Sequence, residues 1–186
     1  MGNNFFVKSL IALFLLAFVP ALTNCSGTLA TFGDDRSREQ TLTDTEIILN
    51  INKRLLSGKN RPLFFSIKVD VFAGRVMLTG TVENEIKKQN AGSLVRGLIG
   101  VQKLYNDIQV TQSPRNTSND IWIDAKIRAQ LLATKNIKSL NYRWRVVNDT
   151  VYILGYARFP SEKAEIVRII RQTSRVRGIV DRVKTN

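Results

Sequence analysis

Val76-Met77-Leu78-Thr79-Gly80 recurs 75 residues later as Val151-Tyr152-Ile153-Leu154-Gly155. The similarity extends outward in both directions: upstream apolar positions repeat at an offset of 76, and a downstream glycine repeats at an offset of 78. Two copies of about 70 residues are too few for a solenoid, which needs about three units to bury a continuous core. We therefore expect two small domains, each folded around its own core.

Each copy predicts the order helix, strand, strand, helix, strand. The first helix of each copy carries apolar residues at i, i+4 and i+8, the spacing of one buried helix face. These residues are Ile47, Ile51 and Leu55 in the first copy, and Ile123, Ile127 and Leu131 in the second. Thr43 and Glu46 have the spacing of a capping box, which predicts that the first helix begins at Thr43.

Alternating apolar and polar residues follow each first helix and predict a β-hairpin. Its turn falls at Ala73-Gly74 in the first copy and at Asn148-Asp149 in the second. Second helices are predicted at 85–98 and 161–175, and the last strands at 101–110 and 179–184. The predicted fold class is α+β, with two tandem αββαβ domains. In each domain, two helices pack on one face of a three-stranded mixed sheet.

The first strand of the second copy has two aromatic residues on its inward side. Trp144 aligns with Val69 of the first copy, and Tyr142 lies two residues before it on the same side. We expect both side chains in the core of the second domain. Arg143 and Arg145 flank Trp144 and belong to the opposite face of the strand.

Residues 1–24 have the form of a signal peptide, because one cation precedes an apolar run too short to span a bilayer. The chain's one cysteine follows, so that Leu22 to Cys25 resembles the lipobox of bacterial lipoproteins. Asn24 departs from it, since glycine, alanine or serine is usual there. The resemblance implies an acylated Cys25, an outer-membrane location facing the periplasm, and a flexible tether over 25–41. The alternative is a soluble secreted protein with a spare cysteine.

Positive charge is concentrated in the second copy. The whole chain has 28 Lys and Arg against 15 Asp and Glu, a formal net charge of +13. Residues 42–112 contain 10 basic and 6 acidic side chains, whereas 113–186 contain 15 and 6, so the two parts carry +4 and +9. Such an excess implies an acidic partner. Because a secretory signal separates the chain from nucleic acid, anionic phospholipid is the expected partner, and nucleic acid is not.

Trp122 lies outside the buried stripe of its helix and corresponds to Glu46, a residue that favours water, in the first copy. Lys126 and Ala129 follow on the same side of the helix. A tryptophan beside a lysine near the start of a helix is typical of a membrane interface, where both the ring and its N–H are satisfied. The alternative is that Trp122 packs against the other domain or the loop beneath it.

The order of elements, Val-x-Leu-x-Gly after the hairpin turn, and a glycine before the last strand resemble the BON domain. Two copies behind a lipobox resemble the dual BON-domain outer-membrane lipoproteins of the DolP type. The likeness covers about residues 42–185 and is most specific in Ser118 to Leu132. It divides the chain into BON domains at 42–112 and 118–186, joined by a linker at 113–117.

This resemblance implies a function for the first helix of the second domain. In those lipoproteins the helix binds anionic phospholipid, chiefly phosphatidylglycerol, and the protein supports envelope integrity and the assembly machinery for β-barrel proteins. The phospholipid-binding residues that it implies here are Ile121, Trp122, Lys126, Arg128 and Ala129. The chain departs from the family in its higher charge, notably Arg168, Arg171 and Arg175 at i, i+3 and i+7 on a predicted helix.

Catalytic and metal-binding functions find little support. The chain has no histidine and one cysteine, so it lacks the usual general base near neutral pH and the usual zinc ligands. We expect no enzymatic activity and no cofactor. Asp120 and Asp124 share a helix face, but near a helix N-terminus they favour the dipole and need no catalytic role. Two further functions stay open: an adaptor that docks on a secretion or β-barrel assembly complex, and a soluble periplasmic chaperone.

Overall fold

The computed structural model describes residues 33–113 and 117–185. Residues 34–186 fall in one compact unit. The first domain contains α2 (Arg38–Leu56), the 3-10 turn η2 (Gly58–Asn60), α3 (Arg61–Ser66), β1 (Ile67–Phe72), β2 (Arg75–Val82), α4 (Glu85–Ser93), β3 (Lys103–Asn106) and β4 (Gln109–Val110). The second contains α5 (Thr117–Ala133), the 3-10 turn η3 (Ser139–Asn141), β5 (Tyr142–Val147), β6 (Thr150–Ala157), α6 (Pro160–Gln172) and β7 (Gly178–Thr185).

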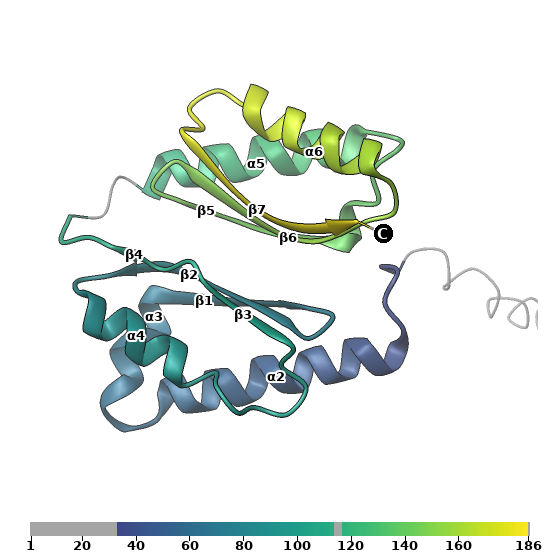
Figure 1. Ribbon diagram of the computed structural model, residues 1–186. Coiled ribbons are helices and arrows are strands. Elements are labelled where there is room, and N and C mark those ends of the chain that lie inside the picture. The colour runs from purple at the N-terminus through teal and green to yellow at the C-terminus, as the bar shows by residue number, and fades with distance from the viewer. Residues whose placement is uncertain (1–32, 114–116, 186) are drawn as a thin grey trace, which may run out of the picture. The chain divides into compact units, whose positions relative to one another are not determined.

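The predicted α+β class and mixed sheets are confirmed. In each domain the hairpin strands pair antiparallel, β1 with β2 and β5 with β6. The last strand then pairs parallel to the second, β3 and β4 to β2 and β7 to β6. Helices lie on one face of each sheet, as Figure 1 shows. Parallel pairing requires a crossover, which α4 and α6 provide.

The last strand of the first domain is shorter than predicted. It is interrupted between β3 and β4, where Ile108 turns into the core and is buried. The second helices also end early, α4 at Ser93 and α6 at Gln172. Gly97 and Arg175, inside the predicted helical ranges, have φ of 73° and 72°, which a right-handed helix cannot contain.

The first helix begins earlier than Thr43. Ser37 is its N-cap: its hydroxyl accepts from the Gln40 N–H, and the Gln40 side chain accepts from the Ser37 N–H. The capping box at Thr43 and Glu46 was therefore wrong, because the same motif occurs six residues upstream and adds more than one helical turn. Residues 38–41, expected in the tether, are helical.

A carboxylate on the first helix of each domain holds the hairpin turn of that domain. Asp44 accepts from the backbone N–H groups of Ala73 and Gly74, each at 2.7 Å. In the second copy Asp120 accepts from Asn148 and Asp149 at 2.9 and 2.8 Å. All four turn residues have positive φ, as a type I′ turn requires. Asp120 therefore joins a helix to a hairpin, a role beyond the favourable helix-dipole interaction expected from the sequence.

The segment before α2 is packed against the second domain. The Asp35 N–H donates to the Asn141 side chain at 2.8 Å, and Asn141 Nδ2 donates back to the Asp35 carboxylate at 2.6 Å. Burial opposes ionisation of Asp35, but the hydrogen bonds from Lys138 and Asn141 outweigh it and lower the carboxyl pKa. Asp35 is thus ionised and paired at neutral pH, so the chain is fixed from this residue onward.

Each domain has its own buried core, as the repeat predicts. A third apolar cluster joins the domains through the sheet faces that their helices do not cover; its buried members are Phe72, Met77, Tyr152 and Leu154. Two ion pairs cross beside it, Arg145 with Asp70 and Arg182 with Asp107, each with two hydrogen bonds of 2.7 to 3.1 Å. β2 and β6 are therefore buried on both faces, which explains why they are apolar runs without alternation.

Arg75 is the most buried charge between the domains, with 4% of its surface exposed. Its guanidinium donates to the backbone oxygens of Gly155 at 2.6 Å and Arg182 at 2.9 Å. Arg75→Ala leaves two carbonyls without these donors, so we expect a loss of about 2–4 kcal/mol in the free energy of unfolding. Denaturant unfolding measures this loss. Arg96→Ala, which removes the same charge from an exposed site, should have almost no effect; equal effects would contradict this role.

Candidate functional site

Helix α5 has two apolar faces. Ile123, Ile127 and Leu131 are buried in the core, as predicted. A second apolar stripe lies on the opposite side of the helix and is exposed; it consists of Ile121, Ala125, Ala129 and Leu132. At 100° per residue these four side chains fall within an arc of about 80°. Ile121 and Leu132, at its two ends, are 65% and 68% exposed.

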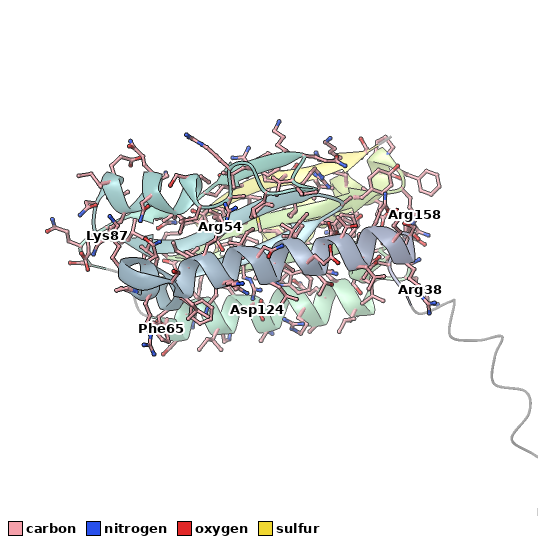
Figure 2. The ribbon with its side chains drawn as sticks, turned by 90° about the horizontal axis from the view of Figure 1, so that it is seen from below. Arg38, Arg54, Phe65, Lys87, Asp124 and Arg158 are labelled. Carbon is pink, nitrogen blue, oxygen red and sulfur yellow. The ribbon has the colours of Figure 1, made fainter. Side chains whose placement is uncertain are left out.

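Charged side chains border this outer stripe on both sides. Arg128 and Asp124 lie along one edge and form an exposed ion pair of 3.3 Å; Asp124 is labelled in Figure 2. The Arg128 guanidinium also lies 5.1 Å from the centre of the Trp144 ring. Lys126 lies along the other edge. The surface is thus an apolar strip with cations on its flanks, the pattern of a helix that lies in a membrane interface.

Trp122 is half-buried at the border of the stripe. Its ring packs against the core of the second domain. The Arg175 guanidinium lies 4.6 Å from the ring centre and the Lys126 ammonium 5.6 Å, both within cation–π range. One part of the ring thus packs on the core of its own domain, and another part stays at the surface beside two cations.

The three arginines expected along one helix, Arg168, Arg171 and Arg175, do not form one free stripe. Arg168 forms an ion pair with Glu165 and a hydrogen bond with Gln172. Arg175 lies beyond the end of the helix. Its backbone has a positive φ, and its guanidinium contacts the Trp122 ring. Arg175 therefore joins the α5 surface, and sequence periodicity missed it because the helix ends three residues earlier.

The aromatic residues of β5 face inward as expected. Tyr142 is fully buried, and burial, assisted by the nearby charge of Glu162, raises the pKa of its phenol. Trp144 is partly buried against the same core. Arg143 and Arg145 lie on the other face of the strand, and Arg145 reaches Asp70 of the first domain.

The model of the BON domain family matches this chain twice, over residues 43–112 and 119–186. The chain belongs to the BON domain family. Both matched ranges agree with the two domains described above. Each range begins within the helix whose aspartate, Asp44 or Asp120, accepts hydrogen bonds from the hairpin turn.

Three similar proteins come from bacteria. A protein from Anaplasma centrale described as uncharacterized, in the gshII 5′ region, is 31% identical over 76% of this chain and 93% of its own length. A 21 kDa hemolysin of Actinobacillus pleuropneumoniae is 27% identical over 63% of each chain. The outer membrane lipoprotein DolP of Haemophilus influenzae is 29% identical over 45% of each chain. The chain is therefore a BON-domain protein with a distant relative in the outer membrane.

The described residues show neither a metal site nor a membrane span. Within 33–113 and 117–185, no three His, Cys, Asp or Glu side chains gather in a way that could hold a metal ion. No helix in these ranges has the length and apolar character needed to cross a bilayer. The predicted signal peptide, the predicted lipobox and Cys25 lie outside the described residues.

Proposed function

We propose that this protein is a lipid-anchored envelope protein, facing the periplasm from the outer membrane, whose helix α5 rests on anionic phospholipid and supports envelope integrity. The observation that carries the proposal is the exposed apolar stripe of α5, with Arg128 on one edge and Lys126 on the other. An apolar strip of this kind enters the acyl boundary, while Lys and Arg at its edges contact anionic headgroups. The proposed phospholipid-binding residues are Ile121, Trp122, Lys126, Arg128 and Ala129, and we extend this set to Ala125, Leu132 and Arg175, which lie on or beside the same stripe.

The equivalent helix of the first domain is a natural comparison. At the repeat offset of 76, Ile121 and Ala129 correspond to Thr45 and Lys53. The outer side of α2 is therefore interrupted by a polar and a charged residue where α5 is apolar. This difference between the copies supports assigning the lipid surface to α5.

The magnitudes indicate that this surface needs a tether. Burying one large aliphatic side chain stabilises by about 1.5–3 kcal/mol, and each cation near an anionic surface contributes about 1 kcal/mol. The costs of association reduce this sum, so the helix alone binds weakly. Acyl chains on Cys25 would contribute about 0.8 kcal/mol per buried CH₂ and would supply most of the membrane affinity.

The fixed N-terminal segment keeps the folded unit close to such an anchor. Cys25 and Asp34 lie nine residues apart, and the chain is packed from Asp34 and Asp35 onward. A nine-residue span is at most about 30 Å long. Within that reach the local concentration of headgroups is high, so a weak surface on α5 is sufficient for lipid selection.

Cys25→Ser tests the anchor. We expect the protein to move from the membrane fraction to the soluble fraction, because the acyl chains provide most of its membrane affinity. Fractionation together with incorporation of labelled palmitate measures this change. Palmitate that still enters the Cys25→Ser protein would contradict acylation at this residue.

An adaptor function is the second candidate, favoured by the outer side of α2. Leu42, Leu49 and Leu56 recur there at seven-residue spacing and are exposed, the arrangement of a seam that contacts another helix. Such a surface suits docking on a secretion or β-barrel assembly complex. Affinity capture of the acylated protein with and without Leu49→Glu distinguishes this function, since lipid binding through α5 would be unchanged.

A further inference from the structure

A pocket of about 250 Å³ opens between the end of α5, η3 and β5. Arginines form much of its wall: Arg128 comes from α5, and Arg143 and Arg145 come from β5. Asp70 of β1 is the acidic residue in the wall. Three guanidinium groups against one carboxylate give the lining a formal charge of +2.

Two of the arginines are held in place, and Arg128 is exchangeable. Arg145 is held by Asp70 through Nε and Nη2, at 2.7 and 2.9 Å, and its Nη1 has no hydrogen-bond partner among the described residues. Arg143 is also held, because its Nη1 donates to the backbone oxygens of Leu140 and Tyr142 at 2.9 and 3.0 Å. Its contact with Asp34, at 3.4 Å, and that of Arg128 with Asp124, at 3.3 Å, are long for ion pairs. Partly exposed pairs of this length contribute little, so a bound anion can replace them. Guanidinium groups suit oxyanions because their N–H groups match two oxygens at once.

Trp144, one of the lining residues, carries an unmatched donor. The Nε1 of Trp144 is buried and has no hydrogen-bond partner in the part of the chain that the structure describes. Arg128 covers the face of the same indole ring. A buried polar atom without a partner is uncommon and calls for an acceptor such as a bound ligand or water.

The rim of the pocket is apolar. Leu132, which ends the outer stripe of α5, and Leu140 of η3 line it, and Leu140 is 47% exposed. A ligand that fits these walls has an anionic group with several oxygens and an apolar continuation. Because the pocket adjoins the outer stripe of α5 at Leu132, the apolar part of such a ligand can lie along α5.

We propose that this arginine pocket binds the phosphodiester of an anionic phospholipid headgroup, with the glycerol side of the lipid against Leu132 and Leu140. This inference rests on the proposed function and extends it, because it assigns headgroup recognition to β5 and η3 in addition to the outer face of α5. Phosphodiester chemistry is shared with free phosphate, so the experiment includes both.

The test uses tryptophan fluorescence of the full chain carrying Cys25→Ser and Trp122→Phe, in which Trp144 is the one remaining tryptophan. The probes are inorganic phosphate, glycerol 1-phosphate and dihexanoylphosphatidylglycerol below its micelle concentration. We expect a saturable change in Trp144 emission that is strongest for the short-chain lipid. Arg128→Gln should weaken it at least tenfold, and Arg128→Lys should restore part of it.

Matched variants separate the pocket from general electrostatics and from the proposed function. Arg171→Gln removes one positive charge from an exposed site on α6 and should leave the titration unchanged. Ile121→Glu should abolish vesicle binding yet keep the response to glycerol 1-phosphate. If Trp144 emission does not change with any probe, or if Arg171→Gln weakens the titration as much as Arg128→Gln does, the proposal of a binding pocket is overturned. Inorganic phosphate binding as tightly as the lipid would overturn its assignment to a lipid headgroup.

Discussion

Gly155→Val is expected to unfold the second domain. A Cβ at this position would lie 2.3 Å from the Asn141 backbone oxygen, 2.7 Å from Tyr142 Cδ1 and 3.0 Å from Tyr142 Cα. Two of these neighbours are backbone, so they cannot move without separating β5 from β6, which pair at Tyr142 and Gly155. We expect a cost of at least about 3 kcal/mol, at or above the upper part of the range for overpacking.

Thermal unfolding with residue-resolved amide exchange measures this effect. The second domain should lose protection throughout, whereas the first should lose it mainly near Arg75, which donates to the Gly155 carbonyl. Gly33→Val is the matched control, because a Cβ there meets no atom within 4 Å. A melting temperature of Gly155→Val equal to that of Gly33→Val would contradict the close approach of β5 and β6 at this residue. Equal loss of amide protection in both domains would show that they are one cooperative unit.

The fold could be predicted from the sequence because its signals are local. The repeat gave the order of elements, and the i, i+4, i+8 spacing gave the core faces of both first helices. The joining of the domains was missed, although Val151 to Leu154 carries its signal. An apolar run without alternation indicates a strand buried on both faces, and Tyr152 and Leu154 occupy the second face.

The candidate site was predicted in part. Ile121, Ala129, Lys126 and Arg128 are exposed on α5. Leu132 and Ala125 were not predicted; alanine carries little signal of its own. Arg175 and the pocket arginines depend on where α6 ends and on contacts between residues far apart in sequence, which periodicity does not contain.

Trp122 is a less selective test than its sequence position implied. Because the ring is half-buried against the core, Trp122→Glu would place a carboxylate partly inside the domain and lower its stability as well as any lipid affinity. A fall in melting temperature would therefore not separate the two roles. The exposed residues at the ends of the stripe provide a cleaner test.

Ile121→Glu and Leu132→Glu are expected to abolish binding to phosphatidylglycerol vesicles. Each places a negative charge in the strip that enters the acyl boundary and also repels the anionic surface. Both side chains are largely exposed, so we expect stability to change by less than about 0.5 kcal/mol. Neutralising Lys126 and Arg128 together should weaken binding and flatten its dependence on salt.

Leu49→Glu on α2 is the matched control. Leu49 is 63% exposed, similar to Ile121, and occupies the corresponding outer side of the first domain. The same change of charge and apolar area there should leave vesicle binding nearly intact. Equal losses in Leu49→Glu and Ile121→Glu would show that charge alone, without a specific surface, governs binding.

The most direct test of the lipid surface is vesicle flotation and melting temperature on the same sample of Ile121→Glu protein. Vesicles of phosphatidylglycerol with phosphatidylcholine, at a lipid concentration high enough to saturate a weak site, are compared with phosphatidylcholine alone, using protein that carries Cys25→Ser so that no acyl chain contributes. We predict that the parent protein floats with the anionic vesicles only, and that Ile121→Glu stays at the bottom with an unchanged melting temperature. Flotation of Ile121→Glu equal to that of the parent would contradict the assignment of lipid binding to α5.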